Sequence, residues 1–99
     1  MTDATRPDEA AVEALEKSLT LPEDAYPLKN YERYYSISNF DGRSMLVGTY
    51  YYVGPERLGS VHFEPSGLPF YHDGGCDIVH VYASEDGKTL QYVACNGEA

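Results

Sequence analysis

The sequence has no tryptophan, only 2 cysteines, and only 7 lysine and arginine residues against 16 aspartate and glutamate residues. The net charge of −9 excludes nucleic-acid binding through phosphate contacts, because such binding needs clustered basic side chains. No hydrophobic run approaches the roughly 20 residues of a membrane-spanning helix. The first residues also lack the basic and apolar segments of a secretory leader, which fits a cytoplasmic protein or an exported one whose leader has been removed.

Motifs for catalysis and cofactor binding are missing as well. Gly74 and Gly75 do not precede a predicted helix, so a phosphate-binding loop is not supported. Ser66 and Ser84 lie in predicted turns that lack the surroundings of a nucleophile. No pair of carboxylates has a spacing that selects it for acid–base chemistry. We therefore predict a protein that is not an enzyme and needs no cofactor.

The N-terminal part of the chain has the pattern of an amphipathic helix. Val12, Leu15 and Leu19 recur at spacings of three and four, which places them on one face of a helix. Pro22 then ends the pattern, because proline lacks the amide hydrogen that helix hydrogen bonding needs. We predict a helix over residues 6–19.

From Tyr31 onward the hydrophobic period changes to two, which indicates strands. Turn-forming sequences separate the runs, and residues 65–75 are expected to form a loop. We predict an α+β fold in a single domain over residues 1–99, with residues 1–5 disordered. One N-terminal helix packs on a four- or five-stranded antiparallel meander sheet within residues 30–97. The predicted strands cover residues 31–38, 43–53, 59–64, 77–83 and 89–95.

Tyrosine is unusually frequent, with 10 residues in the chain. Its ring favours strands and its hydroxyl needs water or a partner. Tyr50, Tyr51 and Tyr52 cannot all point inward, because side chains alternate along a strand. We predict that Tyr34, Tyr50 and Tyr52 form an outward face that binds another protein. The alternative is that the helix or the loop covers these rings and makes them part of the core.

Cys76 and Cys95 flank the last predicted hairpin. A turn centred between Glu85 and Asp86 would place them opposite each other, and a bulge at Gly87 would leave them near neighbours. Opposed residues have Cα atoms about 4.5–5.5 Å apart, which overlaps the range of a disulfide. Two free thiols in a reducing compartment remain an alternative, and a zinc pair is a further one.

Four short segments carry a family resemblance: DGGCDIVHV at residues 73–81, VACNG at 93–97, NYERYY at 30–35, and the strand at 42–50. They resemble a group of short, uncharacterised secreted proteins of proteobacteria, over roughly residues 30–97. The resemblance implies export and a disulfide between Cys76 and Cys95. It implies no activity.

The histidines are His62, His72 and His80. If His62 and His80 lay on neighbouring strands, their rings could approach His72 and Asp73, and the cluster could bind zinc or copper. A packing role is the alternative, because His80 shares its predicted strand face with hydrophobic side chains.

These features lead to a main hypothesis of a bacterial, non-catalytic interaction module in the periplasm or outside the cell. A second hypothesis is a small cytoplasmic inhibitor or immunity-type protein that uses its acidic surface to block a basic site. A third is a carrier of a metal or small ligand that uses the histidines.

Overall fold

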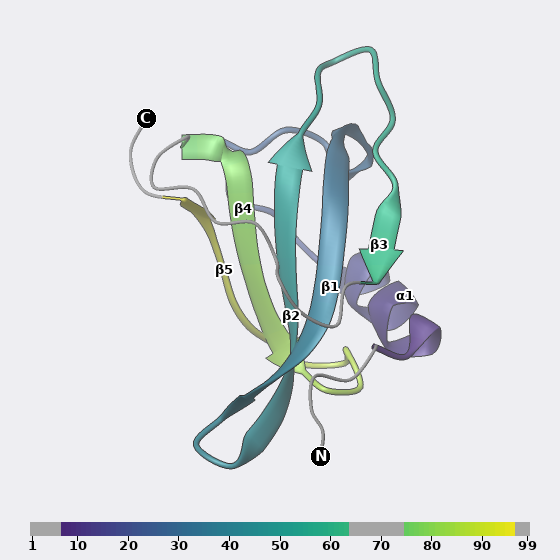
Figure 1. Cartoon of the computed structure of the whole chain (residues 1–99). Coiled ribbons are helices and arrows are strands. Elements are labelled where there is room, and N and C mark those ends of the chain that lie inside the picture. Colours follow the sequence, from purple (N-terminus) through teal and green to yellow (C-terminus); the bar gives the residue numbers. More distant parts are fainter. Residues whose placement is uncertain (1–6, 64–74, 97–99) are drawn as a thin grey trace.

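The computed structural model describes residues 7–63 and 75–96, so the expectations for residues 1–5 and 65–74 lie outside the described residues. Figure 1 shows the arrangement of the helix and the strands. In chain order the elements are the helix α1 (Glu9–Ser18), a short 3-10 helix (Leu28–Asn30), and the strands β1 (Tyr31–Phe40), β2 (Arg43–Tyr52), β3 (Val61–Phe63), β4 (Gly75–Ser84) and β5 (Leu90–Asn96).

The five strands form one sheet in the order β3-β1-β2-β4-β5. The pairs β1–β2, β2–β4 and β4–β5 are antiparallel, and β3 is parallel to β1. The predicted α+β fold, with one N-terminal helix on a mostly antiparallel sheet, is confirmed. The sheet differs from a simple meander because β3 lies at the far edge, beside β1.

A close approach of two backbone segments places β3 there. The link after β2 returns across the start of β1, and Gly59 lies against Tyr31, where a Cβ atom would be 1.8 Å from the Tyr31 carbonyl oxygen. Only a residue without a side chain fits at this distance. Arg33 then donates its backbone N–H to the Ser60 carbonyl at 2.8 Å, which starts the parallel pairing. The local sequence does not reveal this contact, because it joins residues distant in the chain.

The two hairpin turns follow their sequence signals. Asp41 and Gly42 join β1 to β2 with φ angles of 54° and 77°, as a two-residue hairpin turn requires. Gly87 in the β4–β5 turn has a φ of 77°, the left-handed conformation expected there. Gly87 also packs directly on α1, since a Cβ atom would lie 1.9 Å from the Ala11 carbonyl oxygen.

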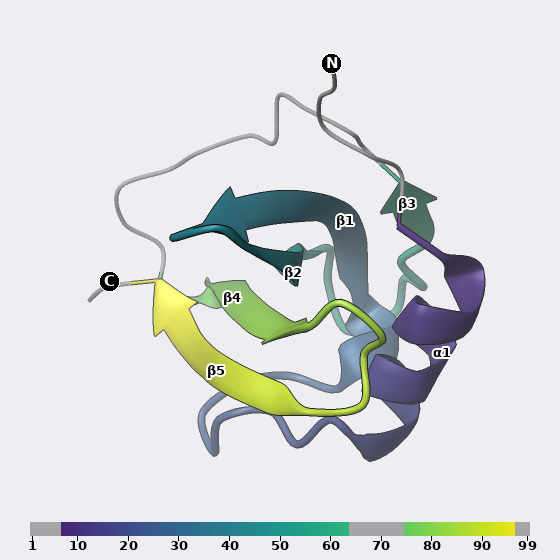
Figure 2. The ribbon, with the colours of Figure 1, turned by 90° about the horizontal axis from the view of Figure 1, so that it is seen from below.

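The helix α1 is capped by Asp8, whose carboxylate accepts a hydrogen bond from the Ala10 N–H at 3.1 Å. The helix is shorter than the predicted residues 6–19. Ala11, Val12 and Leu15 are its buried side chains, which confirms most of the predicted apolar stripe. Figure 2 shows that the sheet is strongly curved and that α1 lies close to β3 and the β4–β5 turn. Among the described residues, no helix is both long and apolar enough to cross a bilayer.

Candidate functional site

Strand alternation gives the sheet two faces with different contents. The face covered by α1 holds three fully buried tyrosines, Tyr31, Tyr35 and Tyr50. Gly48 leaves room for two of them, because a Cβ atom there would lie 2.9 Å from a Tyr35 ring carbon and 3.0 Å from a Tyr50 ring carbon. The strand pairing places a second set of side chains on the opposite, outward face: Glu32, Tyr34, Phe40, Val47, Thr49, Tyr51, His62, Ile78, His80, Tyr82 and Tyr92.

A hydrogen-bond network on the covered face joins α1 to the sheet through Glu16. One carboxylate oxygen accepts from the Arg33 guanidinium at 2.9 Å, and the other accepts from the Tyr35 hydroxyl at 2.7 Å. The Tyr50 hydroxyl lies 2.6 Å from that of Tyr35. Because Tyr35 uses its one hydrogen toward Glu16, Tyr50 is the donor of this second bond.

Burial keeps these two hydroxyls neutral. Loss of solvation raises the pKa of Tyr35 far above its ordinary value of 10.0, and the neighbouring Tyr50 and Glu16 add to the increase. Burial also raises the pKa of Tyr50, although the hydrogen bond with Tyr35 opposes part of the change. Both side chains are 0% exposed, so a substrate has no access to them. The network therefore acts as a structural link between helix and sheet.

The predicted face of Tyr34, Tyr50 and Tyr52 is not formed. Tyr50 is fully buried, and Tyr52 lies on the same side, stacked on Tyr26 with ring centroids 3.7 Å apart. Tyr34 points to the outward face. The reason is the register of β1 and β2, which pairs Tyr34 with Thr49 and so separates it from both predicted partners.

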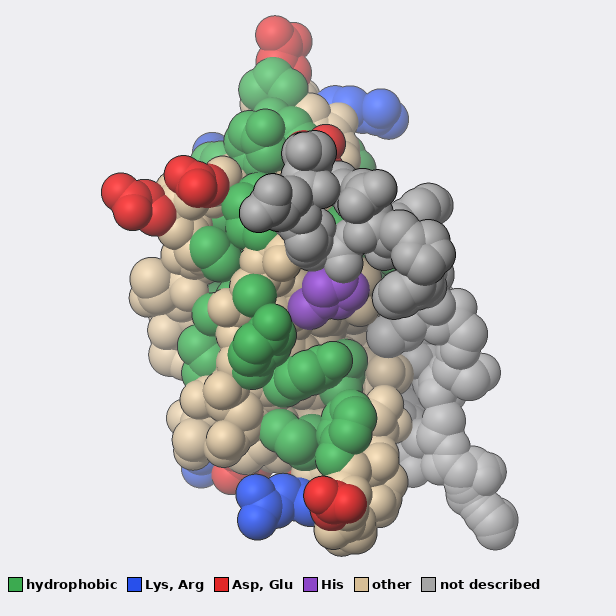
Figure 3. Space-filling view, turned by 90° about the vertical axis from the view of Figure 1, so that its left-hand side faces the viewer, with side chains coloured by type: hydrophobic (Ala, Val, Ile, Leu, Met, Phe, Trp, Pro, Cys, Tyr) green, Lys and Arg blue, Asp and Glu red, His purple; other side chains and the backbone are tan. Residues whose placement is uncertain are grey.

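The outward face carries a different group of aromatic side chains, which we call the aromatic strip: Phe40, Tyr82 and Tyr92. The Tyr82 ring lies 5.6 Å from the Phe40 ring and 5.5 Å from the Tyr92 ring, centroid to centroid. Phe40 is 44% exposed and Tyr92 is 51% exposed. Figure 3 shows hydrophobic side chains gathered on this side of the molecule, beside a histidine. Sequence reasoning missed the strip because its members come from three strands.

A second outward cluster lies between β1 and β3. The His62 ring stacks on Tyr34 with centroids 4.4 Å apart, and Tyr51 meets Tyr34 edge-on at 5.7 Å. The Nε2 atom of His62 is hydrogen-bonded to the Glu32 carboxylate. That bond holds the pKa of Glu32 below its ordinary value. The cluster links the short strand β3 to β1.

The two described histidines, His62 and His80, lie apart on the sheet. His62 is on β3 and His80 is on β4, and the strands β1 and β2 lie between them. Three strand spacings separate them by about 14 Å. The premise of neighbouring strands is therefore wrong, and His72 lies outside the described residues. Within residues 7–63 and 75–96, no group of three potential metal ligands is found.

Cys76 and Cys95 form a disulfide, with Cα atoms 4.6 Å apart. The hairpin register alone does not bring them together, because Cys95 pairs with Val79. The pairs Val79–Cys95 and Gly75–Asn96 are four steps apart on β4 but one step apart on β5. This irregularity moves Cys76 back beside Cys95. The Tyr31 hydroxyl donates to the Cys76 carbonyl at 2.6 Å, which ties the bridge to β1.

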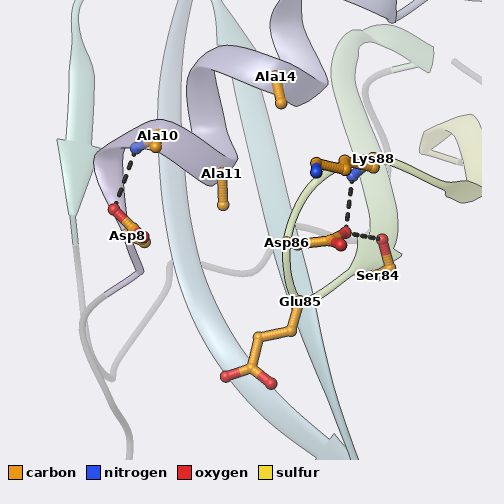
Figure 4. A pocket seen from close by; sticks show the side chains of 8 residues that line it. All are labelled: Asp8, Ala10, Ala11, Ala14, Ser84, Glu85, Asp86 and Lys88. Carbon is orange, nitrogen blue, oxygen red and sulfur yellow. Dashed lines mark hydrogen bonds between the residues drawn. The ribbon is translucent and has the colours of Figure 1, made fainter.

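A groove of about 580 Å³ lies between α1 and the β4–β5 turn (Figure 4). Two of its carboxylates have structural partners: Asp8 accepts from the Ala10 N–H at the helix start, and Asp86 accepts from the Ser84 hydroxyl at 2.7 Å and the Lys88 N–H at 2.9 Å. The bond from Ser84 lowers the pKa of Asp86. These contacts stabilise the helix start and the turn, so two of the carboxylates that line the groove serve the fold.

No family model, curated protein or solved structure matches this chain. The candidate site is the aromatic strip, because its rings pack together and two of them are about half exposed.

Proposed function

We propose that this protein is a non-catalytic interaction module that binds another protein through the outward face of its sheet. The observation that carries the proposal is the aromatic strip, in which Phe40 and Tyr92 both pack against Tyr82 and remain about half exposed. Aromatic side chains are enriched at protein interfaces and contribute much of the binding energy there.

The packing of the three rings supports this role. A ring that is already held by its neighbour loses less conformational freedom on binding than an isolated side chain does. The tyrosines on the covered face have a different role, because they are sealed beneath α1. Binding through the strip would therefore leave the core undisturbed.

The net charge supports a particular kind of partner, and the disulfide supports a particular compartment. The net charge of −9 favours a partner with basic residues around its contact surface. A disulfide between Cys76 and Cys95 persists in an oxidising compartment, which favours the periplasm or the exterior of a bacterial cell. The second candidate, a cytoplasmic inhibitor, would share the acidic surface but would keep both thiols reduced.

The test compares three immobilised proteins: the wild type, the double variant Phe40→Ser with Tyr92→Ser, and the control Leu58→Ser. Leu58 is 74% exposed in the link between β2 and β3, outside the strip. A partner from the cell envelope, identified by mass spectrometry and purified, should bind the wild type and the control but not the double variant. Equal binding by all three would reject the strip as the contact surface.

The intact mass of the protein from its own compartment tests the location. Reductant should increase the mass by two hydrogens if Cys76 and Cys95 are bridged there. An unchanged mass would favour the cytoplasmic alternative.

A further inference from the structure

The strand β5 is one edge of the sheet, next to the aromatic strip. In the described part of the chain, no strand pairs with its outer side, so one row of its backbone N–H and C=O groups is unpaired. β5 runs from Leu90 to Asn96, whereas β3 at the opposite edge has only 3 residues. The edge at β5 is therefore the longer place where a further strand could add.

This edge lacks most of the features that protect edges from pairing. Natural edge strands commonly carry proline or charged side chains, especially lysine. The seven residues of β5 include no charged residue and no proline. A register shift leaves Gln91 without a partner on β4, but the pairing is regular again from Tyr92 to Cys95. A strand could thus align with that stretch while its side chains reach Tyr92.

Acidic side chains stand at both ends of the β4–β5 hairpin. Glu85 and Asp86 are exposed in the turn, and Asp77 is exposed near the disulfide. Lys88 is the basic residue close to the turn. A second copy of this chain would bring like charges together, because either orientation of two β5 edges places acidic ends against acidic ends. A basic segment meets the opposite charge instead.

From the free edge, its neutral sequence and its acidic ends, we infer that β5 binds an extended, lysine- or arginine-containing segment of a partner protein by adding it to the sheet as a further strand. The inference rests on the proposed function and specifies its partner. The backbone of β5 supplies the hydrogen bonds, Tyr92 on the outward face and Leu90 on the other face supply side-chain contacts, and the acidic ends attract the basic residues.

The probe is a labelled peptide of about 8 residues that alternates lysine and valine, a length that spans β5. Two matched peptides carry N-methyl groups on alternate amides, one in each phase, which blocks backbone pairing but keeps the side chains. A fourth peptide replaces lysine by glutamate. Fluorescence anisotropy should show that at least one methylated peptide binds about tenfold more weakly than the parent, as the loss of two hydrogen bonds predicts. The glutamate peptide should not bind.

Protein variants locate the site. Tyr92→Lys places a positive charge at the edge and should weaken binding of the lysine peptide about tenfold, whereas Leu58→Lys adds the same charge to the β2–β3 link and should leave binding unchanged. Circular dichroism checks that both variants are folded. Amide hydrogen exchange should slow at Val93 to Cys95 when the peptide is bound.

The outcomes separate this inference from the proposed function. Equal binding of the parent and both methylated peptides, together with loss in Tyr92→Lys, would reject strand addition but retain a side-chain contact at the strip. Failure of the lysine peptide to bind would reject the inference, while partner capture by the strip would still be judged by its own variants. A concentration-dependent dimer in sedimentation velocity would assign the edge to a second copy and also reject it.

Discussion

The two faces of the sheet both carry tyrosines, but they use them differently. On the covered face, Tyr35 and Tyr50 are 0% exposed, and their hydroxyls end in a hydrogen-bond chain at Glu16. On the outward face, Tyr82 and Tyr92 stack on each other, and Tyr92 is half exposed. The difference teaches that a tyrosine acts as a core residue only where a partner for its hydroxyl accompanies its burial.

The helix supplies that partner. Glu16 reaches the sheet from α1, and Arg33 lies beside it to balance its charge. In the described part of the chain no helix packs on the outward face, where the rings of the aromatic strip contact one another. The covered face therefore maintains the fold, whereas the half-exposed rings of Phe40 and Tyr92 are the part of the outward face that we propose meets a partner.

Alkaline pH should have the largest effect on the covered face, because it should unfold the protein. The pKa values of Tyr31, Tyr35 and Tyr50 are raised above 10.0 in the folded state. Their neutral forms thus contribute stability that is complete below pH 10.0 and is lost as the pH rises further. Tyrosinate absorbance should show that the buried rings of Tyr31, Tyr35 and Tyr50 ionise only together with unfolding. Ionisation of every ring in one step, with the fold retained, would contradict this.

Truncation of one ring on each face compares them directly. Tyr50→Ala should destabilise the protein by about 3–5 kcal/mol, because it removes a buried ring and leaves a cavity. Tyr92→Ala, on the exposed side, should cost less than about 1 kcal/mol. Urea unfolding measures both values, and similar losses for the two variants would show that the faces do not differ as described.

Removal of the disulfide tests the bond that joins β4 to β5 at one edge of the sheet. The double variant Cys76→Ala with Cys95→Ala should lose about 2–4 kcal/mol, mainly because the unfolded chain gains freedom. The same urea experiment measures it, with the oxidised wild type as reference. A loss near zero would mean that the irregular part of β4 holds its position without the bridge.

Neutralising the carboxylate of Glu16 on α1 should have the smallest effect on stability. Glu16→Gln keeps the shape but leaves the Arg33 guanidinium without its charged partner, and it should cost about 1–3 kcal/mol. Glu13→Gln, exposed on the same helix, is the matched control and should change stability by less than about 0.5 kcal/mol. If both variants behave alike, the network does not link α1 to the sheet.

Much of the fold could be predicted, and less of the candidate site. The stripe of Val12 and Leu15 and the turn at Gly87 are signals within a few residues of sequence, so the helix and the hairpins followed from them. The prediction of an outward face of Tyr34, Tyr50 and Tyr52 was wrong, because the number of tyrosines does not show which residues are opposite one another. The strip could have been anticipated only in part, by pairing Tyr82 with Tyr92 across the last hairpin.

The helix and the hairpins follow from local sequence, since periodicity and turn chemistry act between near neighbours. Tertiary structure alone decided three things: that β3 joins β1, that α1 covers the face of Tyr35 and Tyr50, and that an irregularity in β4 brings Cys76 to Cys95. The physical reason is the same for all three. Alternation shows which side chains share a face, but contacts between residues distant in the chain decide which face is buried and which strands are neighbours.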